Sequence, residues 1–298
     1  MKVLVSGASG FIGSALVPVL KSAGHQIIRL VRSTPASRDA IQWDPLSGRL
    51  DVATLAGIDA VIHLAGENIG AGRWTAARKA RIKDSRIKGT KLLAETLATM
   101  NPPPKVLVMT SAVGFYGDRG DEIVDEKSAP GKGFLTEVCQ AWEAAAKSAS
   151  EKDIRIVQLR LGVVLSPKGG ALKKMLLPFR LGVGGVIGGG RQYMSWVALD
   201  DVINVFTLAL GKENMRGTFN LVAPSPATNR AFTKILGRVI SRPTIFPLPA
   251  FVVKLIFGEM GESMLLGSTR AIPTKLLEAG YEFRFPELEG AFRHLLGQ

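Results

Sequence analysis

The hydrophobic positions of the chain fall into two repeating patterns. Short continuous apolar runs, such as "VLV" at 3–5, predict buried strands, whereas apolar residues spaced three or four apart predict helices that bury one face. The helical spacing is clear in "APGKGFLTEVCQAWEAAA", where Phe134, Val138 and Trp142 mark one face. Because strands and helices alternate, the pattern predicts an α/β protein with a parallel, doubly wound sheet. The other runs that predict strands lie within 25–33, 57–70, 105–117 and 154–165.

A glycine-rich turn follows the first strand directly. The stretch "SGASGFIGSALVPVL" places Gly7, Gly10 and Gly13 three residues apart, and an amphipathic helix follows. Gly7 permits a tight turn, Gly10 lets the backbone approach a pyrophosphate, and Gly13 lets the helix pack closely on the strand. The amino terminus of that helix offers free N–H groups and a positive dipole to phosphate oxygens. This strand–turn–helix context predicts a Rossmann-like dinucleotide-binding domain.

The end of the second strand indicates which nicotinamide cofactor the chain prefers. An acidic side chain at this point would hydrogen-bond the ribose hydroxyls of NAD. The chain instead has Arg32 followed by Ser33, and no Asp or Glu stands between Gly24 and Arg38. Because a guanidinium pairs well with a 2′-phosphate, the sequence favours NADP(H). The further residues expected to line the cofactor are Ser9, Phe11, Ile12, Leu64, Ala65, Gly66, Glu67 and Val164.

The overall composition is typical of a globular protein, with 46% hydrophobic and 21% charged residues among 298. The longest apolar stretch, at 246–257, contains two prolines and Lys254, and it is shorter than the roughly 20 residues that span a bilayer. We therefore expect no membrane partner. Cys139 is the only cysteine, which excludes an internal disulfide and a thiolate metal cage. This cysteine usage suits a cytoplasmic protein.

Much of the net charge of +13 is concentrated in one segment. Residues 73–91, which we call the basic run, hold eight Lys/Arg and a single Asp. A helix with a solvated basic face is the simplest explanation, and a positive field that attracts a polyanionic ligand is the second. A nucleic-acid-binding helix is the third, but the basic run has no series of aromatic residues beyond Trp74. We expect no nucleic-acid partner.

Several motifs resemble the extended short-chain dehydrogenase/reductase family, which contains sugar-nucleotide epimerases and dehydratases. The similar segments are the glycine turn, "DAVIHLAG" at 59–66, "GTKLL" at 89–93, "TSAVGFYG" at 110–117 and "WVALDDV" at 196–202. The phrases "AGENI", "GFYGD", "WEAAA" and "MLLPFRLGVGGVIGGGRQYMSW" resemble, more narrowly, an epimerase-like branch with its own C-terminal domain. The resemblance covers essentially the whole chain. It implies a Rossmann-like doubly wound parallel sheet with a smaller C-terminal substrate lobe.

The resemblance breaks down at the catalytic pair of the wider family. That family uses Tyr-x-x-x-Lys, in which the tyrosine acts as acid and base while the lysine lowers its pKa. The corresponding positions fall on Phe134 and Val138 or, shifted by one residue, on Leu135 and Cys139. No Tyr-x-x-x-Lys occurs anywhere in the chain, and Arg86 replaces an asparagine of the family pattern. The resemblance therefore implies a scaffold without the usual proton relay, with Arg86 facing the cofactor.

Two hydroxyl groups are candidates for relocated chemistry. Ser111 matches the Ser/Thr of the family pattern, and Tyr116 follows the same strand, so both hydroxyls are expected near the nicotinamide. A Tyr116 ring packed over the cofactor or the substrate is an equally supported alternative. The three histidines and the single cysteine show no metal-ligand spacing, so no metal site is predicted.

The composition and the resemblance divide the chain into two lobes. We expect residues 1–165, completed by about 196–223, to form the NADP-binding domain. Residues 166–195 and 224–298 are expected to form the smaller substrate lobe. Met194 stands where nucleotide-sugar enzymes of the family usually keep an arginine, which argues against a nucleotide-sugar substrate. The Phe-, Leu-, Met- and Pro-rich part of this lobe suits an apolar cleft wall or the surface of a homodimer.

Two functions remain open from the sequence. The first is an epimerase-like, NADP(H)-dependent oxidoreductase that acts on an unidentified, partly apolar carbonyl or alcohol. The second is a non-catalytic regulatory or interaction protein that binds NADP(H) without turnover. In both cases the small-molecule substrate or effector is unidentified. Whether bound NADPH is consumed distinguishes the two.

Overall fold

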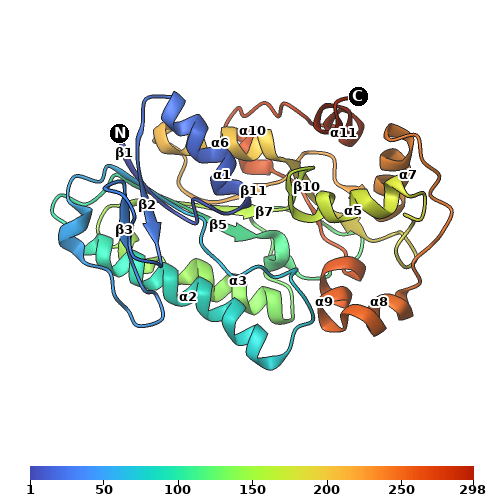
Figure 1. Ribbon diagram of the computed structural model, residues 1–298, viewed down its shortest axis with the longest axis horizontal. Helices are drawn as coiled ribbons and strands as arrows, with labels where there is room; N and C mark the ends of the chain where they lie inside the picture. The colour runs from blue at the N-terminus through green and yellow to red at the C-terminus, as the bar shows by residue number, and fades with distance from the viewer.

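The computed structural model describes residues 1–298 and is built on a seven-stranded parallel sheet (Figure 1). The strand order is β3-β2-β1-β4-β5-β7-β11, so the chain moves outward from β1 and then returns to continue from β4. This is the order of a doubly wound Rossmann sheet, which confirms the predicted fold class. The sheet strands are β1 (Lys2–Ser6), β2 (Gln26–Val31), β3 (Ala40–Gln42), β4 (Ala60–His63), β5 (Val106–Ala112), β7 (Arg155–Leu161) and β11 (Gly217–Leu221).

Helices cover both faces of the sheet, and each face has its own apolar core (Figure 1). On one face, Val5, Leu16 and Phe206 belong to a buried cluster between the strands and two helices. On the other face, Leu93 and Trp142 belong to a second buried cluster. The helices of the first face are α1 (Phe11–Ser22) and α6 (Leu199–Gly211); those of the second are α2 (Ala76–Ala98), α3 (Phe134–Ala144) and α4 (Lys147–Ser150). Short helical turns lie at η1 (Val52–Leu55) and η2 (Val113–Tyr116).

The single strand predicted at 154–165 is divided in two. β7 ends at Leu161, and the chain then leaves the sheet as β8 (Val163–Ser166), which pairs in parallel with β10 (Trp196–Ala198). The break falls at Gly162, where an added Cβ would lie 2.5 Å from the backbone oxygen of Ser195. The close approach of a second backbone segment therefore redirects the strand, and β8 leads into the second lobe.

The second lobe has a separate core that includes Trp196, Phe232 and Phe292. None of the helices in the protein combines the length and the apolar character needed to cross a membrane. The helices of this lobe are α5 (Gly170–Arg180), α7 (Asn229–Val239), α8 (Ala250–Phe257), α9 (Glu259–Gly261), η3 (Glu262–Leu266) and α11 (Leu288–Leu296), and β9 (Tyr193–Met194) pairs there with β12 (Ala227–Thr228). The chain also returns to the sheet domain, where β13 (Arg270–Ala271) pairs with β6 (Ile123–Val124) and Leu276 of α10 (Thr274–Glu278) joins the core of the first face.

A buried carboxylate ties the C-terminal segment to the sheet domain. Asp201, in the first turn of α6, accepts a hydrogen bond from the hydroxyl of Tyr281 at 2.8 Å. It also accepts the backbone N–H groups of Arg284 at 2.8 Å and Phe285 at 3.2 Å. Burial raises the pKa of Tyr281, so its hydroxyl stays protonated and remains a donor. These contacts hold the two lobes in one arrangement.

Candidate functional site

The glycine turn lies at the crevice between β1 and β4, where the strand order reverses. Gly7 has a φ of 69°, and a Cβ there would lie 2.8 Å from the carbonyl carbon of Leu64. A Cβ on Gly13 would collide with the carbonyl oxygen of Gly7. A Cβ on Gly10 would meet only the Gly7 oxygen, at 3.1 Å. Two glycines are therefore needed for backbone packing, and Gly10 leaves a more open face for a ligand.

The amino end of α1 leaves backbone donors free. The hydrogen bonds of the helix begin with the N–H of Ser14, which donates to the carbonyl of Gly10 at 2.8 Å. The N–H groups of Phe11, Ile12 and Gly13 have no partner within the protein. Unpaired amides at a helix amino terminus fit the oxygens of a pyrophosphate. The turn therefore has the donors that a dinucleotide needs.

The second lobe contacts this turn through the Phe11 side chain. A Cβ on Gly169 would overlap the Phe11 ring, and one on Gly170 would lie 3.0 Å from the ring and 3.1 Å from the carbonyl oxygen of Val164. Phe11 and Val164, two of the predicted cofactor residues, therefore lie close together where α5 begins. Ser9 and Gly10 remain exposed beside them.

Arg32 stands one residue beyond the end of β2, with Ser33 beside it, and both are exposed. Arg32 makes no ion pair within the protein. On the same strand, by contrast, Arg29 pairs with Asp39 at 3.0 Å. The Arg32 guanidinium is therefore free to bind an anion at the position expected for a ribose 2′-phosphate. Its role in cofactor choice stays a prediction.

The carboxyl end of β4 is held by Ser6. The Ser6 hydroxyl accepts the N–H groups of Leu64 at 3.2 Å and Ala65 at 3.3 Å, and it hydrogen-bonds Nδ1 of His63 at 2.6 Å. Burial lowers the pKa of His63 to about 4, so its imidazole is neutral near pH 7. His63 is a core residue, and the group fixes the strand end beneath the crevice.

Arg86 supports the loop that follows β4. Its Nη1 donates to the carbonyl oxygens of Glu67 and Ile82, both at 3.1 Å. The guanidinium lies 5.0 Å from the ring centroid of Trp142 and packs near Gly66. Burial lowers its pKa. Nε and Nη2 make no hydrogen bond within the protein, so they remain available to a ligand.

Most cations of the basic run are solvated, as the simplest explanation of its charge predicts, but Arg78, Lys79 and Arg86 make contacts within the protein. Lys79 hydrogen-bonds both carboxylate oxygens of Glu259, at 2.8 and 3.0 Å, and so joins α2 to α9 of the second lobe. Arg78 lies 3.6 Å from the carboxylate of Glu67, in the loop after β4. Several cations of the run therefore hold α2 in place between the crevice and the second lobe.

Neither predicted catalytic hydroxyl faces a cleft. Ser111 is buried and donates to Oε1 of Glu143 at 2.6 Å. Tyr116 is fully buried, donates to Oδ1 of Asn220 at 2.8 Å and accepts from Nη1 of Arg160 at 2.9 Å. Burial raises the pKa of the Tyr116 hydroxyl. These contacts do not support a catalytic role for the two hydroxyls, which stays a prediction.

The two hydroxyls belong to a buried network that the sequence analysis missed. Arg160 binds Glu143 through two bonds, Nε to Oε1 and Nη2 to Oε2, both at 2.8 Å. The side chains are 6% and 11% exposed, and the Arg160 guanidinium lies 3.4 Å from the ring centroid of Phe115. The sequence feature that could have indicated this network is Arg160, a charged residue within the mostly apolar strand "IRIVQLRLGVVL". We call Ser111, Glu143, Arg160, Tyr116 and Asn220 the buried network.

Of the two residue pairs that could correspond to the family's tyrosine and lysine, Leu135 and Cys139 lie at the end of β5. Both approach Gly114 just beyond β5, where an added Cβ would lie 3.2 Å from Leu135 Cβ and 3.8 Å from Cys139 Sγ. Phe134 instead packs on Trp74, with ring centroids 5.2 Å apart. Burial raises the pKa of Cys139 to about 11, which disfavours a thiolate. Leu135 and Cys139 therefore supply no acid or base at this end of β5, and the nearby carboxylate of Glu143 is already bound to Ser111 and Arg160.

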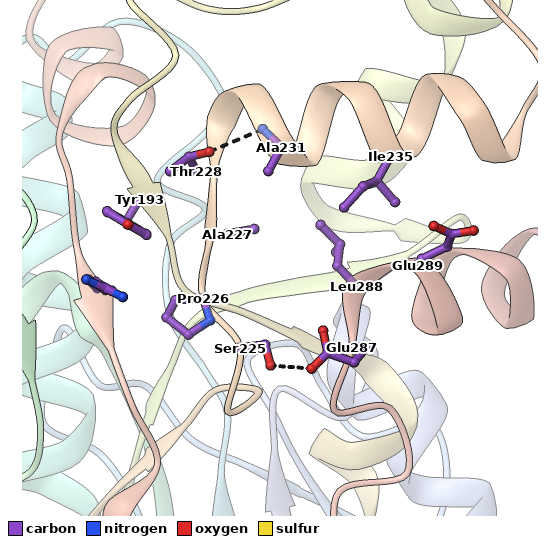
Figure 2. Close-up of a pocket in the computed structure, with 11 residues that line it drawn as sticks. Tyr193, Ser225, Pro226, Ala227, Thr228, Ala231, Ile235, Glu287, Leu288 and Glu289 are labelled. Atoms are coloured by element: carbon purple, nitrogen blue, oxygen red, sulfur yellow. Dashed lines mark hydrogen bonds between the residues drawn. The ribbon is translucent and has the colours of Figure 1, made fainter.

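A separate hollow of about 480 Å³ is formed entirely by residues of the second lobe (Figure 2). Within it, Ser225 donates to Glu287 at 2.7 Å, and the Arg270 guanidinium lies 4.6 Å from the ring centroid of Tyr193. No residue that lines it belongs to the predicted cofactor site. The protein contains no group of three or more His, Cys, Asp or Glu side chains placed to hold a metal ion.

Two family models match the chain. The model of the NAD dependent epimerase/dehydratase family matches residues 3–221, and a domain of unknown function, DUF1731, matches residues 248–295. An epimerase family protein of Mycobacterium tuberculosis is 42% identical over 281 residues, which cover 94% of this chain and 93% of that protein. The human epimerase family protein SDR39U1 is 38% identical over 299 residues, which cover 99% of this chain and 100% of that protein.

A solved structure is similar over its full length. The crystal structure of human SDR39U1 (isoform 2) with NADPH matches this chain with a TM-score of 0.91 and 37% identity, covering 100% of both chains.

Proposed function

The chain belongs to the NAD-dependent epimerase/dehydratase family, and from this premise we propose that it binds NADP(H) without carrying out the family's proton-transfer chemistry. In this proposal the protein is a cofactor-binding regulatory or interaction protein. Its ligands are NADP(H) and an unidentified small-molecule effector.

The residues of the crevice fit the cofactor. The unpaired amides of Phe11, Ile12 and Gly13 would bind the pyrophosphate, and the exposed Arg32 would bind the 2′-phosphate. The NADPH-bound structure of the human relative supports the same choice of cofactor. When bound, the nicotinamide supplies a hydride donor or acceptor.

The observation that carries the proposal is the chemistry at the end of β5. Leu135 and Cys139, one of the two residue pairs that could correspond to the family's tyrosine and lysine, meet Gly114 there. A leucine has no proton to transfer, and the raised pKa of Cys139 keeps it a neutral thiol. General acid–base catalysis typically contributes 10²–10⁴-fold in rate. Without it, the hydride transfer lacks the proton transfer that accompanies it in the family.

A second candidate function is an NADP(H)-dependent oxidoreductase that uses Arg86 in place of the tyrosine. The observation that favours it is the Arg86 guanidinium, which packs near Gly66 and whose Nε and Nη2 make no hydrogen bond within the protein. A guanidinium there would hydrogen-bond a carbonyl oxygen and stabilise the developing negative charge. It would not transfer a proton, because its charge is retained near pH 7.

The experiment measures NADPH binding and NADPH consumption on the same protein. Binding is followed by nicotinamide fluorescence, and consumption by nicotinamide absorbance with a panel of aldehydes, ketones and nucleotide sugars. We expect saturable binding and no consumption. Gly13→Val is the control without cofactor, because its side chain would collide with the Gly7 carbonyl.

Consumption by the wild type that disappears in Gly13→Val would refute the binding-protein proposal. In that case, loss of turnover in Arg86→Gln with NADPH affinity retained would support the oxidoreductase. Turnover that survives Arg86→Gln would exclude both the binding-protein proposal and the catalytic role of Arg86.

A further inference from the structure

The second lobe has a charge pattern that the cofactor site does not explain. Residues 166–195 and 224–258 contain ten Lys/Arg and no Asp or Glu. Two of these cations are paired, Lys254 with Glu262 at 2.7 Å and Arg238 with Glu289 at 2.9 Å, and the nearby Glu259 binds Lys79. This part of the molecule therefore presents cations with few competing anions.

Large apolar side chains are exposed among these cations. Leu177 and Leu181 lie one turn apart at the end of α5, with Arg180 between them, and all three are exposed. Phe251 and Leu255 likewise lie one turn apart on α8, with 71% and 72% of their surface exposed. Helices that combine exposed large apolar residues with cations are typical of surfaces that enter the boundary of a lipid bilayer.

The backbone joins these residues into one surface. The segment after α5 runs beside the segment before α8, because Leu248 N–H donates to the Val186 carbonyl and Gly188 N–H donates to the Leu248 carbonyl, both at 2.8 Å. The same pairing brings Gly185 against the backbone of the exposed Phe246, because an added Cβ on Gly185 would overlap the Phe246 carbonyl oxygen. α8 follows almost at once, at the lower right of Figure 1. We call this surface, formed by residues 177–183 and 245–255, the apolar–basic face.

We propose that the apolar–basic face docks the protein on an anionic membrane surface. An eight-residue helix is too short to cross a bilayer, but Phe251 and Leu255 are placed to enter its outer layer. The exposed Arg180 and the neighbouring Arg242, which donates to the Arg180 carbonyl at 2.9 Å, would lie at the level of the lipid phosphates, where each cation strengthens binding. A second copy of the chain is a poorer occupant, because it would bring two cationic surfaces together without acids to pair them.

The test is flotation of purified, NADPH-loaded protein with vesicles. One set contains equal parts of phosphatidylcholine and phosphatidylserine, and the other contains phosphatidylcholine alone. We expect binding to the anionic vesicles that is lost at high salt. Phe251→Ser combined with Leu255→Glu should reduce binding about tenfold or more, and Arg180→Gln about fivefold.

Leu46→Glu is the matched control, because Leu46 is 71% exposed but lies in the sheet domain near β3. It should bind vesicles like the wild type, and an NADPH titration of every variant confirms that it is folded. Equal binding to neutral vesicles, or equal loss in Leu46→Glu, would overturn the proposal. A dimer that Leu255→Glu dissociates, without any vesicle binding by the wild type, would assign the face to a second copy instead.

Discussion

The two edges of the crevice are built in opposite ways. On the cofactor edge, the glycine turn leaves the amides of Phe11 and Ile12 unpaired, and Arg32 is exposed without an ionic partner. On the reaction edge, at the end of β5, the hydroxyls of Ser111 and Tyr116 are hydrogen-bonded to partners inside the protein. The polar groups of the open cofactor edge therefore have no partner within the protein, whereas those of the closed reaction edge are hydrogen-bonded inside it.

Under the proposed function, this difference would let a Rossmann-like scaffold keep a cofactor-binding surface without the reaction chemistry of the family. An open edge adds little to the stability of the fold, because its polar groups are hydrogen-bonded by water until a ligand arrives. The closed edge holds a buried ion pair between Glu143 and Arg160. Removing either side chain would leave the other charge buried without a partner, which strongly destabilises a fold. Substitutions on the cofactor edge should therefore change affinity, and those on the reaction edge should change stability.

The largest effect is expected for Arg160→Met on the reaction edge. This substitution leaves the Glu143 carboxylate buried without its partner, which should lower the free energy of unfolding by about 3–5 kcal/mol. Chemical denaturation measures the change. Arg238→Met is the control, because Arg238 pairs with Glu289 at an exposed site and should cost less than about 1 kcal/mol. Similar losses for the two variants would contradict a special role for the buried pair.

His63, on β4 between the two edges, should make stability depend on pH. Its pKa is lowered from 6.5 to about 4 in the folded protein, so the unfolded chain binds a proton more readily. Stability should therefore fall as pH is lowered from about 6.5 to 4, by about 3 kcal/mol from this group. In His63→Gln that part of the pH dependence should disappear from urea titrations. An unchanged slope between these pH values would show that His63 does not stay neutral in the fold.

The cofactor edge should respond in affinity and not in stability. Arg32→Ala should weaken NADPH binding by about 1.5–3 kcal/mol, or roughly 10- to 150-fold, because a charged contact to the 2′-phosphate is lost. NADH affinity and the denaturation midpoint should not change. Arg29→Ala is the control on the same strand, since Arg29 is already paired with Asp39. An equal loss of NADH affinity would show that Arg32 does not read the 2′-phosphate.

The smallest effect is expected for Tyr116→Phe. It removes a donor to Asn220 and an acceptor for Arg160 while the ring still fills its site, so the protein should lose about 1–2 kcal/mol of stability. NADPH affinity should be unchanged, because the hydroxyl does not face the crevice. Thermal denaturation and fluorescence titration test both parts. A weaker NADPH affinity at unchanged stability would place Tyr116 back at the ligand.

The sequence by itself determined the sheet domain and its glycine turn. These features depend on local rules, since apolar runs predict strands and the spacing of Gly7, Gly10 and Gly13 specifies a turn whose backbone contacts exclude a Cβ at Gly7 and Gly13. The absence of a Tyr-x-x-x-Lys pair was equally visible. The sequence pattern alone predicts the structure wherever a residue's neighbours along the chain determine its conformation.

Only the tertiary structure decided where the remaining polar side chains go. Ser111, Glu143, Arg160 and Asn220 come from β5, α3, β7 and β11, and the bond from Tyr116 to Asn220 joins residues 104 positions apart. The sequence could place Ser111 and Tyr116 near the carboxyl end of a strand, but not the direction of their hydroxyls. That direction depends on the pleat of β5, on the short helical turn η2 after it, and on which buried charges lie opposite. Packing between distant segments therefore buries both of these hydroxyls and gives each a partner inside the protein.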